Sequence, residues 1–183
     1  MTPAPDLTAA APAPPRLLQA CFEAAAARWP EQLAVDVPPG PGRDQRHTAT
    51  YAELAARAHT LAALLRPRLT RDAIVALHLC RDTPDLYAAQ LAVLFAGGAW
   101  TCIDPTFPDD QVQAILDDAA PAAVLADAAG VARLQRLHPG TDLLVDTAAY
   151  LATAPAAAPL AAAPWQDAQS LACLLYTSPS PRD

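Results

Sequence analysis

The stretch LAVLFAGGAWTCIDPTFP, from Leu91 to Pro108, indicates how this chain is organised. An apolar helix is expected to end at Gly97-Gly98, because glycine adopts a positive φ without a Cβ clash. A short buried strand is predicted over 99–103, and Asp104-Pro105 ends it. Pro108 is expected to begin the next helix, since a first helical residue has no partner for its N–H. This order of helix, turn, strand, turn and helix is one repeat of an α/β sheet.

The segments on both sides of this stretch continue the alternation. The run from Ile74 to Leu79 is apolar without alternation, which is typical of a strand buried on both faces of a parallel sheet. Thr50 and Glu53 have the spacing of a capping box at a helix start, and Thr83 is expected to cap the helix that Pro84 begins. The patterns predict helices over 17–29, 51–65, 84–96, 108–118 and 131–137, and strands over 33–37, 46–50, 74–79, 99–103, 122–126, 143–145 and 170–176. The fold class predicted is α/β, with a mostly parallel sheet flanked by helices.

Two segments are expected to lack regular structure. Residues 1–15 are rich in alanine and proline, and we expect them to form a disordered arm, because repeated prolines oppose both helices and strand pairing. Residues 152–164, ATAPAAAPLAAAP, read as a low-complexity connection.

Composition limits the classes of function. The chain has 183 residues, enough for one domain with a hydrophobic core. Its formal net charge of −7 argues against nucleic-acid binding, which needs clustered basic residues. All twelve basic residues are arginine, so chemistry that requires a lysine is excluded on these residues.

The cysteines and histidines form no recognisable site. The four cysteines are far apart and contain no C-x-x-C pair, so we expect buried free thiols and not a zinc or redox motif. The four histidines lack the spacing of metal ligands, and no metal site is predicted. The adjacent Asp117 and Asp118 point different ways around a helix, and we interpret them as solvated charges at a helix end. The cysteines are Cys21, Cys80, Cys102 and Cys173, and the histidines are His47, His59, His78 and His138.

The N-terminal sequence favours a cytoplasmic protein. It lacks the basic and apolar regions of a signal peptide. No apolar run is long enough to span a bilayer, so no membrane partner is expected.

The stretch from Leu91 to Pro108 resembles the second core motif of the adenylate-forming (AMP-binding) superfamily, close to L-x-A-G-[GA]-A-[YW]-x-P-[IL]-D-P-x-[YF]-P. Phe95 replaces a usual lysine of that motif, and Cys102 replaces a usual proline. The first core motif, [LF]-[ST]-Y-x-E-L, is similar to the segment from Thr50 to Leu54. The positions that match the second motif are Leu94, Ala96, Gly97, Gly98, Ala99, Trp100, Ile103, Asp104, Pro105, Phe107 and Pro108.

The resemblance also implies a site near the end of the chain. The segment from Ser170 to Ser178 is similar to the strand that enters the family's ATP phosphate loop, Y-T-S-G-[ST]-T-G-x-P-K-G. It makes Thr177 and Ser178 the candidate ATP-binding residues, and it supplies no catalytic residue. Pro179 stands where the first glycine of the loop is expected, and proline has no N–H to offer a phosphate. As written, the loop is expected to bind triphosphate poorly.

The last residues, 173–183, have two interpretations. CLLYTSPSPRD looks like the translation of a transposon-end sequencing adapter, and on that interpretation the tail is not native. The position of YTS relative to the second motif also suits the family. We favour the adapter-derived tail, because two prolines in a glycine loop have no physical rationale.

The resemblance implies that residues 16–178 are the N-terminal part of the large subdomain of an adenylation domain, most similar to those of nonribosomal peptide synthetases. Such enzymes use ATP and Mg²⁺ to convert an amino acid into an acyl adenylate. They then pass the acyl group to the phosphopantetheine thiol of a carrier protein. The truncated chain is expected to be inactive alone and to have the remainder of its own domain as a partner.

Two alternatives stay open. One is a part of an acyl-CoA or acyl-carrier-protein ligase of the same superfamily. The other is a non-catalytic α/β interaction module, which would melt cooperatively without exposing the apolar surface expected of a truncated sheet.

Overall fold

The computed structural model describes residues 17–40 and 43–176. The helices are α1 (Leu18–Arg28), α2 (Tyr51–Leu65), a 3₁₀ turn η1 (Arg66–Arg68), α3 (Pro84–Ala96), α4 (Asp109–Ala119), α5 (Ala128–Leu137) and α6 (Thr147–Thr153). The strands are β1 (Leu33–Val37), β2 (His47–Thr50), β3 (Ile74–His78), β4 (Ala99–Cys102), β5 (Ala123–Ala126) and β6 (Leu144–Asp146).

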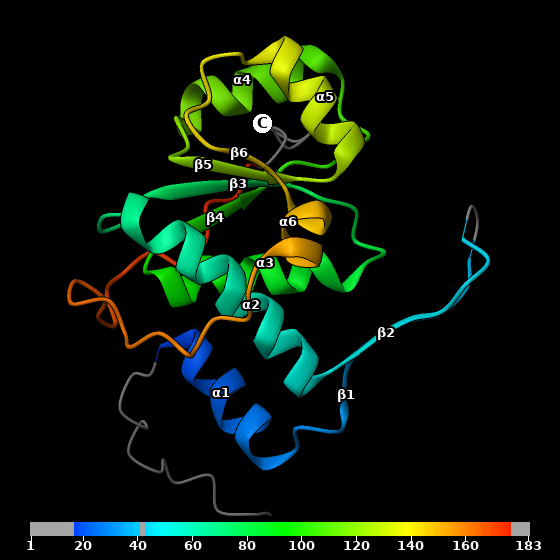
Figure 1. Ribbon diagram of the computed structural model, residues 1–183. Coiled ribbons are helices and arrows are strands. Elements are labelled where there is room, and N and C mark those ends of the chain that lie inside the picture. Colours follow the sequence, from blue (N-terminus) through cyan, green and yellow to red (C-terminus); the bar gives the residue numbers. More distant parts are fainter. Residues whose placement is uncertain (1–16, 41–42, 177–183) are drawn as a thin grey trace, which may run out of the picture.

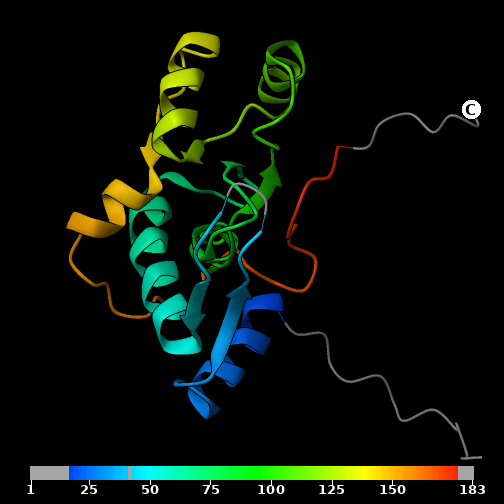
Figure 2. The same ribbon diagram turned by 90° about the vertical axis from the view of Figure 1, so that its right-hand side faces the viewer.

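A four-stranded parallel sheet forms the middle layer, with the strand order β4-β3-β5-β6. Val75 of β3 lies opposite Trp100 of β4 on one side and opposite Ala123 of β5 on the other. Helices α2 and α3 cover one face of this sheet, and α4 and α5 cover the other (Figures 1 and 2). The antiparallel pair β1–β2 is a separate sheet beside α1 and α2. The predicted α/β class with a parallel sheet flanked by helices is confirmed.

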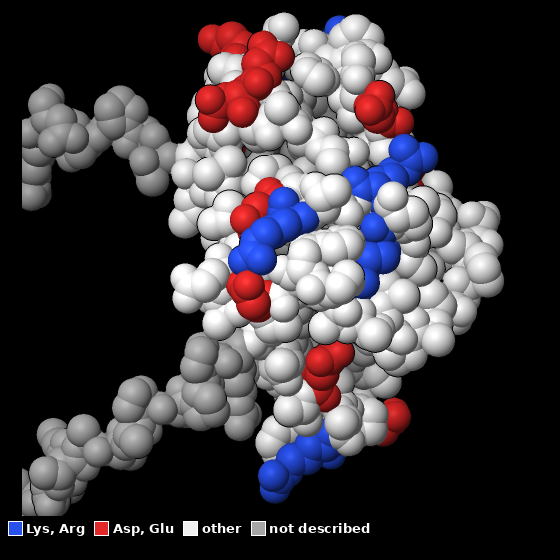
Figure 3. Space-filling view, turned by 90° about the vertical axis from the view of Figure 1, so that its left-hand side faces the viewer, with Lys and Arg blue, Asp and Glu red and all other residues white. Residues whose placement is uncertain are grey.

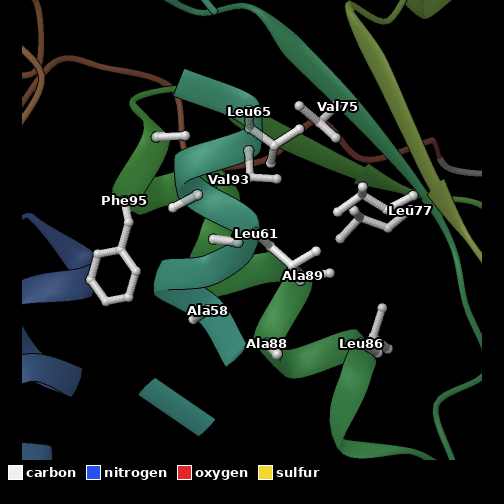
Figure 4. Close-up of a cluster of buried hydrophobic side chains, with 14 of the residues drawn as sticks. Ala58, Leu61, Leu65, Val75, Leu77, Leu86, Ala88, Ala89, Val93 and Phe95 are labelled. Carbon is white, nitrogen blue, oxygen red and sulfur yellow. The ribbon is translucent and has the colours of Figure 1, made fainter. Parts of the chain in front are cut away.

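The larger core lies between the sheet and the helices α2 and α3 (Figure 4). Leu61 and Leu65 of α2 and Leu77 of β3 are fully buried there. Small side chains allow the two helices to approach closely, because an alanine adds little bulk between their backbones. The fully buried alanines of α2 and α3 are Ala58, Ala62, Ala88, Ala89, Ala92 and Ala96.

The two glycines after α3 have different roles. Gly97 has a φ of +88°, as expected for a helix C-terminus. Gly98 lies against neighbouring backbone, since a Cβ there would come 2.8 Å from the carbonyl oxygen of Ala73. The turn between α3 and β4 therefore requires glycine twice, once for conformation and once for space.

The predicted capping box is confirmed. The Thr50 hydroxyl accepts the N–H of Glu53 at 3.2 Å, and the Glu53 carboxylate accepts the N–H of Thr50 at 2.9 Å. We expect Thr50→Ala to lower the free energy of unfolding by about 1 kcal/mol, because it leaves a helix N–H without its acceptor. Urea unfolding monitored by circular dichroism measures this, and Thr50→Ser should restore most of the loss.

Several local predictions were wrong. Residues 170–176 do not form a strand, and only Cys173 makes an isolated parallel bridge, with Trp100. Pro108 is the residue before α4 and not its first. Thr83 does not cap α3 with its hydroxyl, which instead donates to the carbonyl of Cys80 at 3.4 Å.

The burial of the cysteines was also predicted wrongly. Cys21, Cys80 and Cys102 are exposed free thiols, and Cys173 is half-buried. Spacing alone gave no information on which side of an element each thiol faces.

Helix α6 was missed. It follows Asp146, whose carboxylate accepts the N–H of Ala149 at 3.0 Å. Asp146 is a normal N-cap residue, so the sequence contained a signal for this helix.

The predicted arm 1–15 lies outside the described residues.

Candidate functional site

The carboxyl ends of β3, β4 and β5 form the candidate site. Open parallel sheets bind ligands at this edge, where consecutive connections leave toward opposite faces. The chain after β3 leads to α3 on one face, whereas the chains after β4 and β5 lead to α4 and α5 on the other (Figure 1). The connections therefore diverge at the end of β3, and this part of the sheet edge is left uncovered by them.

A surface hollow of about 420 Å³ lies at this edge. Arg81 follows β3, and Asp104 and Pro105 follow β4. The lining residues are Leu79, Arg81, Leu86, Tyr87, Gln90, Cys102, Ile103, Asp104, Pro105, Phe107 and Tyr176. The second core motif thus builds part of the hollow.

Asp104 organises the turn after β4. Its carboxylate accepts the N–H of Thr106 at 2.9 Å and the Thr106 hydroxyl at 2.7 Å. Arg81 donates to the same carboxylate at 3.2 Å. The pKa of Asp104 is lowered, first by the Thr106 N–H and then by the Thr106 hydroxyl, with a smaller contribution from Arg81. Asp104-Pro105 therefore stabilises the turn, and the carboxylate oxygens of Asp104 already accept hydrogen bonds from Thr106 and Arg81.

Arg133 of α5 holds the same turn from the other side. Its guanidinium donates to the carbonyl of Pro105 at 2.9 Å and to the carbonyl of Phe107 at 2.5 Å. It also donates to the carboxylate of Asp109 at 2.8 Å. No sequence pattern marks this residue, because its carbonyl partners lie far away in the chain.

His78, the last residue of β3, is buried beside Arg133 at 2% exposure. Its Nε2 lies 3.4 Å from an Arg133 nitrogen, and since a guanidinium only donates, the ring nitrogen is the acceptor. A Cβ on Gly130 would come 2.6 Å from Nδ1, so the ring packs directly against the backbone of α5. Burial is the main cause that lowers the pKa of His78, and the charge of Arg133 lowers it further.

We expect the free energy of unfolding to fall as the pH drops below about 6.5. The pKa values of both buried histidines, His59 and His78, are lowered from 6.5 in the folded chain. Below pH 6.5 the unfolded chain therefore binds protons that the folded chain does not, and unfolding becomes more favourable. Urea titrations between about pH 7.5 and 5.5 should therefore show the free energy of unfolding decreasing as the pH is lowered. An equally steep pH profile in His78→Gln would contradict the contribution of His78.

The other two histidines and the paired acids lie near the surface. The Nε2 of His138 is 3.5 Å from the carboxylate of Asp117, and Asp118 accepts a hydrogen bond from the Tyr176 hydroxyl at 2.6 Å. Burial first, and then this bond to Asp118, raise the pKa of Tyr176 to about 12. The Nδ1 of His47 lies 3.0 Å from the carbonyl oxygen of Asp82.

The predicted ATP residues, Thr177 and Ser178, lie outside the described residues. Tyr176 directly precedes them and borders the hollow, next to the carboxyl ends of β3 and β4. Of the described residues that line the hollow, Arg81 is the only basic one, and its guanidinium is paired with Asp104. This lining does not match a triphosphate, so the described residues support no phosphate-binding step.

Within the described ranges 17–40 and 43–176, no group of three or more His, Cys, Asp or Glu side chains could hold a metal ion. Across the same residues, none of the helices has the length and apolar character needed to cross a membrane.

The charged residues of one face are interspersed. Figure 3 shows arginine groups next to acidic groups over the middle of this face. Elsewhere in the described chain too, charges of opposite sign pair, as Arg71 does with Asp167 at 2.9 Å.

Comparison with known proteins gives a consistent match. The family model described as AMP-binding enzyme matches residues 22–180. Malpinin synthetase from Mortierella alpina is 36% identical over 165 residues, which cover 88% of this chain and 2% of that protein. Syringomycin synthase SyrB1 from Pseudomonas syringae pv. syringae is 33% identical, over 91% of this chain and 25% of its own length. The chain thus spans a small part of these relatives.

Solved structures give the same result. The nonribosomal peptide synthetase FmoA3 (S1046A) matches with a TM-score of 0.71 and 31% identity, over 92% of this chain and 17% of its own. Its α-methyl-L-serine-AMP bound form matches with a TM-score of 0.68 and 30% identity, over 84% and 16%. The N-terminal subdomain of Klebsiella oxytoca NpsA has a TM-score of 0.63 at 21% identity, over 80% and 35%, and shows the same fold.

Proposed function

Because the chain belongs to the family of AMP-binding enzymes, as the N-terminal part of an adenylation domain of the nonribosomal peptide synthetase type, we propose that its parent protein activates an amino acid with ATP. A carboxylate oxygen of the amino acid would attack the α-phosphorus of ATP, and pyrophosphate would leave. The observation that carries this proposal is the match to the FmoA3 form that holds α-methyl-L-serine-AMP, at 30% identity.

The proposal extends to a carrier protein. The FmoA3 structures are described as nonribosomal peptide synthetases, and an acyl adenylate needs an acceptor. In the proposed second step, the phosphopantetheine thiol of a carrier domain attacks the acyl carbon, and AMP leaves. Mg²⁺ would accompany ATP in the first step. A cytoplasmic location stays a prediction.

An exchange of segments tests the proposed reaction. Residues 17–172 would replace the matching segment of FmoA3, which keeps its own phosphate loop and substrate pocket. We expect the chimera to catalyse ATP–pyrophosphate exchange that depends on α-methyl-L-serine. A matched chimera with Arg133→Met, which cannot hold the turn at Asp104, should exchange more slowly. A folded first chimera without any exchange would contradict the proposal.

The 183 residues alone are proposed to be inactive. The lining of the hollow offers no unpaired basic side chain among the described residues, and Pro179 removes a backbone donor from the implied loop. Residues 173–183 are proposed to be an adapter-derived tail. Long-read sequencing of the source DNA across codons 172–183 tests this, and we expect the reading frame to continue into a glycine-rich loop. Recovery of both prolines would overturn the proposed tail.

A further inference from the structure

The segment from Ala161 to Ala172 contains no helix or strand, yet it is attached at several points to the rest of the molecule. We call it the strap. It begins within the low-complexity connection and passes beside the C-terminus of α3 before it reaches β4 (Figures 1 and 2).

The first attachment is the C-terminus of α3. The Trp165 indole N–H donates to the carbonyl of Gly97 at 2.8 Å, and the Gln166 amide donates to the carbonyl of Leu94 at 2.7 Å. A Cβ on Gly97 would come 2.6 Å from the Cβ of Ala163 and 2.9 Å from the indole nitrogen. Helix C-termini leave carbonyls without intrahelical partners, and here the strap supplies the donors. The turn at Gly97 is therefore the docking surface for the strap.

Two arginines make the second attachment. Arg66 donates to the carbonyl of Ala161 at 2.7 Å and to the carbonyl of Phe95, at the end of α3, also at 2.7 Å. Arg71 donates to both carboxylate oxygens of Asp167 at 2.9 Å. Both bonds come from the Nη2 of Arg71, while its Nη1 donates to the carbonyl of Trp165 at 3.1 Å.

The third attachment is at Leu171, one residue before the chain pairs with Trp100 of β4. The carboxylate of Asp72 accepts the N–H of Leu171 at 2.9 Å. Asp72 has a φ of +57°, so its position depends on a left-handed turn that aspartate and asparagine tolerate. Directly after this contact, the Trp100 N–H donates to the carbonyl of Ala172 at 3.1 Å, and the Leu174 N–H donates to the carbonyl of Trp100 at 2.8 Å.

These contacts restrict the register of residues 172–176, that is, which of them lies opposite a given residue of β4. A slip by one residue along β4 would turn every following side chain to the opposite face. The pairing with Trp100 consists of two backbone hydrogen bonds, so by itself it specifies the register weakly. Because both bonds use backbone atoms, they do not depend on which side chains occupy positions 173–176.

We propose that the strap sets the register of residues 172–176 beside β4, with Trp165 and Asp72 as positioning residues for the pairing with Trp100. Trp165 fixes the strap on the Gly97 turn, and Asp72 fixes the backbone one residue before the pairing. This register is independent of the proposed function.

Hydrogen exchange of the full chain, measured by NMR, tests the positioning roles. Trp165→Phe keeps the ring and removes the indole donor. Asp72→Gly removes the acceptor and still permits the positive φ, whereas Asp72→Asn keeps an acceptor oxygen. We expect the amide of Leu174 to exchange about tenfold faster in Trp165→Phe and Asp72→Gly, and at nearly the original rate in Asp72→Asn.

The comparison amides are those of the core. Val93 in α3 and Leu77 in β3 should keep their protection in all three variants, because neither contacts the strap through its N–H. Unchanged exchange at Leu174, or an equal acceleration at Val93 and Leu77, would overturn the proposal. No nucleotide is involved, so this result and the outcome of the FmoA3 exchange can be told apart.

Discussion

Replacing Gly97 by alanine is expected to lower the free energy of unfolding by about 3 kcal/mol. The φ of +88° disfavours any residue with a Cβ. The added methyl would also lie 2.6 Å from Ala163 and 2.9 Å from the indole nitrogen of Trp165. Strap and helix would have to separate, and the indole would lose its bond to the Gly97 carbonyl.

Gly140→Ala is the matched control. A Cβ at Gly140 meets no atom within 4 Å, and its φ lies outside the left-handed region. This substitution should change the free energy of unfolding by less than about 0.5 kcal/mol. Urea unfolding of both variants decides the matter, and equal effects would contradict the role given to the Gly97 turn.

Leu77→Ala is expected to lower the free energy of unfolding by about 3 kcal/mol. Leu77 lies in β3, the strand between β4 and β5, and its side chain is fully buried against α2 and α3 (Figure 4). Truncation would leave a cavity that two helices and a sheet cannot easily collapse around.

Leu171→Ala serves as its control. This leucine is 51% exposed, so the same truncation should cost less than about 0.5 kcal/mol. The midpoint of urea unfolding should shift only for Leu77→Ala. Similar shifts for both leucines would mean that β3 is not the centre of the core.

Local patterns predicted the elements well wherever periodicity, glycine or a cap marked them. The capping box at Thr50 and the glycine stop at Gly97 are confirmed because both depend on residues close in the chain. Tertiary contacts decided the rest. Residues 170–176 are apolar like a strand, but they meet β4 at one position and are otherwise held by side chains from elsewhere.

The candidate site was less predictable than the fold. Asp104 was recognised from the second core motif, and the structure shows that its oxygens are used in the turn. Arg133 was not recognised, because a long side chain that donates to distant carbonyls leaves no pattern in the sequence. His78 was considered only as a histidine without the spacing of a metal ligand. Trp165 was likewise missed, since it lies between the low-complexity connection, 152–164, and the predicted strand, 170–176.

We propose that these residues supply the fold of the N-terminal part of an adenylation domain and not its reaction. The most direct test is ATP–pyrophosphate exchange by the purified 183-residue chain with a panel of amino acids, with FmoA3 as the positive control. We expect no exchange above background from a chain whose circular dichroism spectrum shows that its helices are formed. Exchange that depends on one amino acid would contradict it.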